Sequence, residues 1–132
     1  QKEQAAGALV NLSFNANNNV AIAQAGGIPP LVALARDGSD KQKEYAANAL
    51  ANLSVNDDNE VAIAAAGGIP PLVALARGGS DKQKEWAAMA LGYLACNANN
   101  AVAIAAAGGI PPLVALARGG SDKQKEWAAM AL

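Results

Sequence analysis

The sequence of 132 residues lacks histidine and has a single cysteine, Cys96. Without histidine the chain has neither the commonest general base nor a frequent metal ligand. One cysteine excludes an internal disulfide framework. Aromatic side chains are also scarce, with two tryptophans, two tyrosines and one phenylalanine. We therefore expect a protein that is not an enzyme, without catalytic residues, metal ligands or a cofactor.

A basic face and a long apolar run are absent as well. The formal net charge is −1 and the isoelectric point is about 5.3. Each lysine group is mixed with acids in an Asp-Lys-Gln-Lys-Glu segment, which is typical of a solvated edge and not of a phosphate-binding patch. The longest apolar stretch, 101–117, is interrupted by Gly108-Gly109 and Pro111-Pro112. We expect neither nucleic acid nor a membrane as a partner.

What the chain does have is an internal repeat. The tripeptide Gln-Lys-Glu begins at positions 1, 42, 83 and 124, so the spacing is 41 residues each time. A fixed period of about 40 residues is typical of solenoid proteins. We divide the single array 1–132 into a partial repeat 1–40, two repeats at 41–81 and 82–122, and a partial third helix at 123–132.

Each repeat contains start and stop signals for three helices. Asn56–Asn59 offers several candidate N-caps, and Gly67-Gly68 ends the helix that follows. Pro70-Pro71 suits the first turn of a second helix, which stops at Gly78-Gly79. Ser80 with Gln83 forms a predicted capping box for the third helix. The helices expected in this repeat are 60–66, 70–77 and about 82–95, with no strand, so the predicted fold is all-α.

The segment Val-Ala-Ile-Ala-x-Ala-Gly-Gly-Ile-Pro-Pro-Leu-Val-Ala-Leu, followed by Ala-Ala-x-Ala-Leu-x-Asn-Leu, resembles the armadillo repeat of β-catenin and importin-α. The resemblance covers essentially the whole chain in three successive copies. It implies a right-handed α-solenoid of three-helix repeats whose third helices line a concave groove. Recent duplication and consensus design would both produce such similar copies. We expect a consensus-like or engineered array.

The copies differ most in the third helix, at three sites. The residues there are Gln4, Tyr45, Trp86 and Trp127; Gly7, Asn48, Met89 and Met130; and Asn11, Asn52 and Tyr93. Offsets of 0, +3 and +7 place these sites within about 60° of helix surface. The packing face is instead Ala87, Leu91 and Leu94. A core position would not exchange tryptophan for glutamine between such similar repeats, so we predict an exposed binding stripe. Inter-repeat packing and neutral drift are the alternatives.

The family resemblance gives these sites a role. An asparagine near the end of the third helix bonds the backbone of an extended peptide in armadillo proteins, and Asn11 and Asn52 match it. A side-chain amide offers both a donor and an acceptor for that purpose. Tyr93 replaces the asparagine in the third copy. The family's tryptophan position holds glycine, asparagine or methionine, and Trp86 and Trp127 lie one turn before it.

These departures, and the lack of acidic side chains on the stripe, disfavour a lysine-rich peptide. Tryptophan, tyrosine and methionine are frequent in interface hot spots and adaptable surfaces. We therefore expect an extended peptide or a partner helix of apolar or aromatic character. The predicted peptide- or protein-binding residues are Gln4, Asn11, Tyr45, Asn48, Asn52, Trp86, Met89, Tyr93, Trp127 and Met130.

Two further features have simple structural explanations. Cys96 stands where the other copies have Phe14 and Val55, so it is predicted to be a small apolar residue. The acidic segment Asp57-Asp58, with Glu60, is replaced by asparagines and alanine in the other copies. It is predicted to cap a helix and not to bind a metal.

Self-assembly is the alternative function. Solenoid ends expose apolar surface that a neighbouring repeat would cover, and terminal repeats normally carry a polar cap. This chain begins in a third helix and ends at Leu132, partway through another. We expect a homo-oligomer formed by head-to-tail stacking or domain swapping, in which case the array would be a designed scaffold without a natural ligand. A natural protein of this kind would be intracellular, in the cytoplasm or nucleus.

Overall fold

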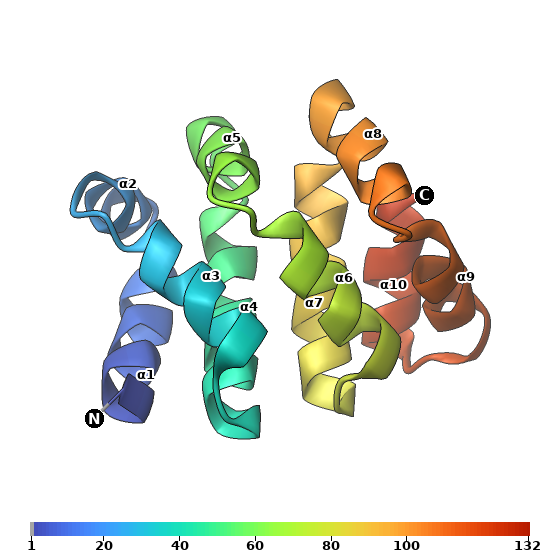
Figure 1. Cartoon of the computed structure of the whole chain (residues 1–132), viewed down its shortest axis with the longest axis horizontal. Helices are drawn as coiled ribbons and strands as arrows, with labels where there is room; N and C mark the ends of the chain where they lie inside the picture. Colours follow the sequence, from blue (N-terminus) through green and yellow to red (C-terminus); the bar gives the residue numbers. More distant parts are fainter. Residues whose placement is uncertain (1) are drawn as a thin grey trace.

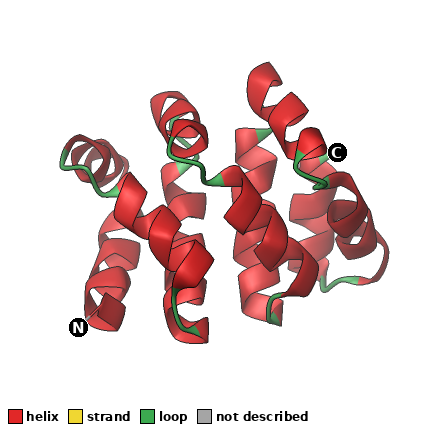
Figure 2. Cartoon of the chain, in the orientation of Figure 1, coloured by secondary structure: helices red, strands yellow, loops and turns green. Residues whose placement is uncertain are grey.

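The computed structural model describes residues 2–132, and this part of the chain contains ten α-helices and no strand (Figures 1 and 2). The predicted all-α fold is confirmed. The helices are α1 (Lys2–Ser13), α2 (Ala16–Gln24), α3 (Ile28–Asp37), α4 (Asp40–Leu53), α5 (Asp57–Ala65), α6 (Ile69–Gly78), α7 (Asp81–Leu94), α8 (Ala98–Ala106), α9 (Ile110–Gly119) and α10 (Asp122–Ala131).

The helices form three rows (Figure 1). The third helices of successive repeats, α1, α4, α7 and α10, pack side by side, and we call them the third-helix row. The second helices α3, α6 and α9 form a parallel row, and each packs on the third helix that follows it in the chain. The short helices α2, α5 and α8 form the remaining row. Each repeat therefore contacts mainly its two neighbours, which is the arrangement of a solenoid.

Helix boundaries follow the predicted caps, with one shift. Asn56 is the N-cap of α5, because its side chain accepts a hydrogen bond from Asn59 N at 3.1 Å. Helix α5 therefore begins at Asp57, three residues before the expected start. Gly67, with φ of 79°, follows the end of this helix in the left-handed conformation that glycine adopts without strain. The capping box of α7 is present, with both Ser80–Gln83 bonds formed.

The core lies between the rows of second and third helices. The predicted packing face is confirmed, since Ala87, Leu91 and Leu94 are 0% exposed. Leu72 of α6 is also fully buried. Burial of apolar side chains stabilises the stack by about 25 cal/mol per Å² of apolar surface removed from water.

Capping glutamines also connect successive repeats. Gln83 Nε2 donates to Asp40 O at 2.8 Å, and Gln124 Nε2 donates to Asp81 O at 2.9 Å. The Oε1 atom of each glutamine meanwhile accepts from the N-cap serine of its own helix, Ser80 or Ser121. One side chain thus satisfies a helix N-terminus and fixes the register between two repeats.

An arginine makes a second connection between repeats. Arg77 Nη2 donates to Gly108 O at 3.1 Å. The equivalent Arg36 instead donates to Asp37 Oδ2 at 2.9 Å. The other two copies have Gly78 and Gly119 in place of this aspartate. A single substitution therefore redirects the arginine within its own repeat.

Among residues 2–132 no single helix is long and apolar enough to cross a membrane, although the bent pairs α5–α6 (89°) and α8–α9 (92°) satisfy length and composition criteria together.

Glu60 should make stability depend on pH. Its side chain is buried between repeats, and this burial, followed by the charge of Asp57, raises the pKa of the carboxyl group. The folded state therefore keeps this proton to a higher pH than the unfolded chain, and stability is lost as pH rises between the two pKa values. We expect Glu60→Gln to raise the melting temperature at pH 7.

The pH profile distinguishes this effect from general repacking. Below the pKa of glutamate in unfolded chains, about 4.3, the melting-temperature difference between Glu60→Gln and the parent should vanish. Asp58→Asn, at an exposed site in the same helical turn, is the control. An equal difference at pH 3.5 and pH 7 in circular-dichroism melts would show that the charge is not the cause.

Candidate functional site

The predicted binding residues lie on the third-helix row. Helix α1 carries Gln4 and Asn11, and α10 carries Trp127 and Met130. Because the four third helices pack side by side, positions 41 residues apart are aligned along the row. The residues on the two central helices are Tyr45, Asn48 and Asn52 of α4 and Trp86, Met89 and Tyr93 of α7. We call these ten residues the third-helix stripe.

The stripe is less exposed than the sequence predicted. Of its ten residues, only Gln4, Asn11 and Met130 are exposed to solvent. Asn52 is 9% exposed, and the remaining members are half-buried: Tyr45, Asn48, Trp86, Met89, Tyr93 and Trp127. Tyr45, Trp86, Met89 and Trp127 also pack against the core. These side chains therefore do both things that could explain their variation between copies: they pack between repeats, and they leave part of their surface exposed to solvent.

Aromatic contacts connect α7 with α10. The ring centroids of Tyr93 and Trp127 are 5.8 Å apart, and the planes are tilted by 45°. Such tilted pairs are worth about 0.5 to 1.5 kcal/mol beyond the buried area. The tyrosine that replaces the family's asparagine thus holds the next third helix. It still leaves part of its surface open to solvent.

Gly92 is a member of this packing that sequence comparison did not single out. A Cβ atom at this position would lie 2.4 Å from Met130 Cε and 3.3 Å from Trp127 O. The equivalent residues in the other copies are Val10 and Ala51. The pairs equivalent to Gly92 and Met130 are Ala51 with Met89 and Val10 with Asn48, so the two smallest residues of the three stand opposite methionine.

Asn52 is not free to act as a complete peptide-backbone partner. Its Nδ2 donates to Ser13 Oγ at 3.0 Å and to Asn48 Oδ1 at 3.2 Å. Its backbone carbonyl also accepts from Asn19 Nδ2 at 3.2 Å. Both amide hydrogens are therefore used inside the protein, and the role of Asn52 in peptide binding stays a prediction. The equivalent Asn11 on α1 is exposed to solvent.

Charges at the start of the third helices are balanced in place. Lys41 Nζ lies 3.6 Å from Glu44 Oε2 and 5.6 Å from the centre of the Tyr45 ring. Lys82 and Glu85 form the equivalent pair at 3.5 Å. Exposed pairs of this kind contribute about 0 to 1 kcal/mol. They place no net charge beside the stripe, whose own ten residues include no carboxylate.

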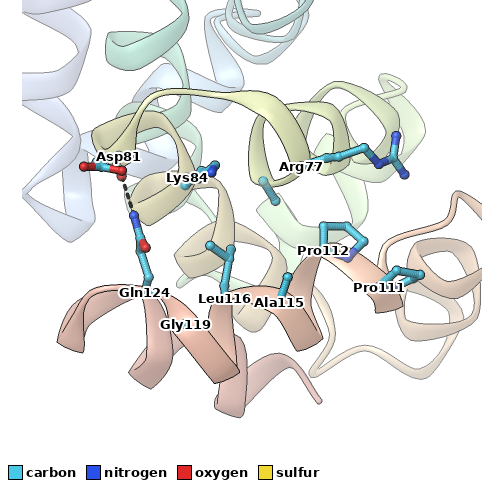
Figure 3. Close-up of a pocket in the computed structure, with 11 residues that line it drawn as sticks. Arg77, Asp81, Lys84, Pro111, Pro112, Ala115, Leu116, Gly119 and Gln124 are labelled. Carbon is cyan, nitrogen blue, oxygen red and sulfur yellow. Dashed lines mark hydrogen bonds between the residues drawn. The ribbon is translucent and has the colours of Figure 1, made fainter.

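Two notches repeat on another side of the array, and Figure 3 shows the larger. It has a volume of about 460 Å³ between α6, the start of α7 and α9, and the equivalent notch one repeat earlier has about 250 Å³. Two of its polar side chains bond the neighbouring repeat: Gln124 donates to Asp81 O (Figure 3), and Arg77 donates to Gly108 O. These notches are joints between repeats.

No cluster of three metal-ligating side chains occurs among the described residues. Asn56, and not the acidic segment, supplies the capping bond of α5, so the predicted capping role of these acids is corrected. Asp57, Asp58 and Glu60 lie in the first helical turn, where the helix dipole favours negative charge. Cys96 is exposed at the end of α7, as are its equivalents Phe14 and Val55.

Three rows of helices repeating every 41 residues define an α-solenoid of three-helix repeats. Residues 15–55 match the armadillo/beta-catenin-like repeat. This repeat belongs to the armadillo/beta-catenin-like family, the whole chain shares the fold of designed armadillo repeat proteins, and its nearly identical copies make it a consensus-like array.

Solved structures of designed proteins share this fold. A designed armadillo repeat protein superposes with a TM-score of 0.92 at 27% identity, covering 99% of this chain and 56% of its own. A computationally designed armadillo repeat protein for modular peptide recognition gives 0.91 at 28% identity, covering 98% and 56%. Another, in complex with the peptide (KR)4, gives 0.89 at 28% identity, covering 98% and 55%.

The chain spans little more than half the length of these structures. No curated protein sequence matches it.

Proposed function

We propose that the protein is a non-catalytic, peptide-binding scaffold whose ligand lies along the concave side of the solenoid, on the third-helix stripe. The observation that carries this proposal is the line of half-exposed aromatic and thioether side chains on α7 and α10. Large side chains that keep part of their surface in water can bury it against a ligand. The designed proteins for modular peptide recognition support the same use of the fold.

The stripe divides into two halves of different chemistry. The α1–α4 half offers Gln4, Asn11 and Asn48, and the α7–α10 half offers mainly apolar surface. One similar protein is in complex with the peptide (KR)4. The stripe here has no carboxylate to pair with such cations, so we propose an extended peptide whose apolar or aromatic residues lie against α7 and α10.

The double substitution Trp86→Gln with Tyr93→Asn tests this function. It should weaken binding of an apolar, aromatic-containing peptide at least tenfold, because it removes the two aromatic rings of α7, both of which are partly exposed. Fluorescence anisotropy with labelled extended peptides measures the effect, and Val61→Gln, at an exposed site on α5, is the control. Tighter binding of (KR)4 than of any apolar peptide, unchanged in the double variant, would contradict the proposal.

Self-association is a second candidate function, and a comparison between copies favours it. Ile110 is 50% exposed, whereas the equivalent Ile28 and Ile69 are 3% and 4% exposed. At the other end Leu12 is 48% exposed, whereas its equivalent Leu53 is fully buried. The same apolar positions are thus covered inside the array and uncovered at its two ends. A second copy of the chain, like a further repeat, would cover them.

A further inference from the structure

The side-chain amides of Asn48 and Asn52, one turn apart on α4, have fixed orientations. The hydroxyl group of Ser13 on α1 donates its one proton to Val10 O at 2.7 Å, so its oxygen can only accept a bond from Asn52. Asn52 therefore turns Nδ2 towards Ser13 Oγ, at 3.0 Å. The second hydrogen of this Nδ2 is donated to Asn48 Oδ1 at 3.2 Å, which in turn fixes the Asn48 amide.

These bonds leave one acceptor and one donor group unused. Among the described residues nothing donates to Asn52 Oδ1, and Asn48 Nδ2, with two N–H groups, donates to nothing. The buried side-chain atoms without a partner in this part of the chain are Asn19 Oδ1 and Asn59 Nδ2, so the two unused atoms on α4 are not buried. Because the two amides bond each other, a free acceptor and free donors lie within reach of one small group.

The surface beside this pair is open towards α1. The position equivalent to Asn48 is Gly7 on α1, whereas it is Met89 on α7 and Met130 on α10. For a Cβ atom on Gly7, the nearest contact beyond the α1 backbone would be Tyr45 Cε2, at 3.9 Å. The ring of Tyr45 therefore borders a space that a larger residue at position 7 would occupy.

We propose that Asn48 and Asn52 form a subsite for the primary amide of a glutamine or asparagine side chain in the peptide ligand; this inference rests on the proposed peptide-binding function. In a primary amide the carbonyl oxygen and one N–H lie side by side. Such a group can accept from Asn48 Nδ2 and donate to Asn52 Oδ1 at the same time. The space at Gly7 takes the rest of the side chain beside Tyr45. Ser13 is a positioning residue, because it acts through Asn52.

The distribution of the pair among the copies favours a side chain over the peptide backbone. Every second residue of an extended peptide also presents an N–H and a C=O on one side, so a pair that binds the backbone would be useful on each third helix. Of the three third helices that include both positions, α4 alone has two asparagines, since α1 has Gly7 with Asn11 and α7 has Met89 with Tyr93. A pair that occurs once suits a ligand group that occurs once.

The same two atoms discriminate against other side chains. Lysine and arginine offer donors and no acceptor, so they leave the donors of Asn48 without a partner. Methionine is similar to glutamine in length, but it would cover both free atoms of the pair without bonding them. Glutamine should therefore be preferred to both kinds of residue.

Fluorescence anisotropy with labelled peptides tests the subsite. Each peptide joins an apolar half, Leu-Thr-Trp-Thr-Leu, to a polar half, Thr-Xaa-Thr-Xaa-Thr, in either order, with Gln, Met or Lys as Xaa. In the order that binds more tightly, the parent should bind the Gln peptide about tenfold more tightly than the Met or Lys peptide. Ser13→Ala should bring the Gln-to-Met ratio close to one, because Asn52 is then free to turn. Its affinity for the Met peptide should not change, whereas a general loss of structure would weaken both.

Asn48→Asp should change the preferred ligand. Aspartate keeps an oxygen that accepts from Asn52 but replaces the free donors by a second carboxylate oxygen. The Lys peptide should then bind about tenfold more tightly than the Gln peptide, the reverse of the parent. Asn99→Asp, at an exposed site on α8, makes the same change of charge away from the stripe and should keep the preference for Gln.

Two failures have different meanings. A parent chain that binds none of these peptides would overturn the proposed peptide binding and the amide subsite with it. Gln and Met peptides that bind the parent equally, while Trp86→Gln with Tyr93→Asn weakens both, would overturn the subsite alone. If Asn48→Asp then weakened both peptides to the same extent, the pair would belong to the peptide backbone and not to a side chain.

Discussion

Leu53→Ala should lower the free energy of unfolding by about 2 to 5 kcal/mol, the usual cost of removing a fully buried leucine side chain. Leu53 is 0% exposed at the C-terminal end of α4. The substitution removes apolar contacts and leaves a cavity that rigid helices on both sides can close only in part. Urea unfolding followed by circular dichroism at 222 nm measures the loss.

The chain supplies its own matched control for this substitution. Leu12 has the same position in the preceding copy but is 48% exposed, so Leu12→Ala should cost about 1 kcal/mol or less. Both variants should be compared at a concentration where the chain is monomeric. Equal losses would mean that the end of α1 is as well packed in solution as the end of α4, contrary to the structure.

Gln83→Glu should lower the free energy of unfolding by about 2 to 4 kcal/mol, although glutamate is an equally good partner in a capping box. Gln83 is only 4% exposed, and its Nε2 donates to Asp40 O of the preceding repeat. A carboxylate cannot donate that bond and would place an unpaired charge against a carbonyl oxygen. The same urea titration measures the cost.

Gln42→Glu makes the identical chemical change in the preceding capping box. Gln42 bonds Ser39 in both directions, and no bond from it to an earlier repeat occurs among the described residues. We expect a change within about 0.5 kcal/mol, as for an ordinary surface substitution. If both glutamates destabilise equally, the effect belongs to the capping box and the connection between repeats contributes little.

Much of the local structure could be predicted because it depends on neighbouring residues. Glycine at a left-handed C′ position, paired prolines in a first turn and the Ser-x-x-Gln capping box act within a few residues of one another. The start of α5 was misplaced because Asn56 and Asn59 are equally good N-caps by residue type. In the structure Asn56 is the N-cap, and the helix that begins after it buries Asn59 and Glu60.

The candidate site was predicted only in part. Variation among copies located Trp86, Met89 and Tyr93 on one side of the third helix, and the structure aligns them with their equivalents on neighbouring helices. Periodicity could not show that Tyr93 contacts Trp127 or that Gly92 leaves space for Met130. Those contacts join residues 34 and 38 positions apart, from one repeat to the next.

The sequence by itself determined the class of fold, because helix signals are local and a 41-residue period can be counted without coordinates. It also determined the packing face of the third helix, since side-chain direction in a helix follows from residue number. Only the tertiary structure showed that the side-chain amide of Asn52 donates to Ser13 and Asn48. It also showed that Ile110 is exposed to solvent whereas Ile69 is buried. The physical reason is that hydrogen bonding and burial depend on the repeat lying alongside, and equivalent residues in identical repeats acquire different surroundings when their neighbours differ.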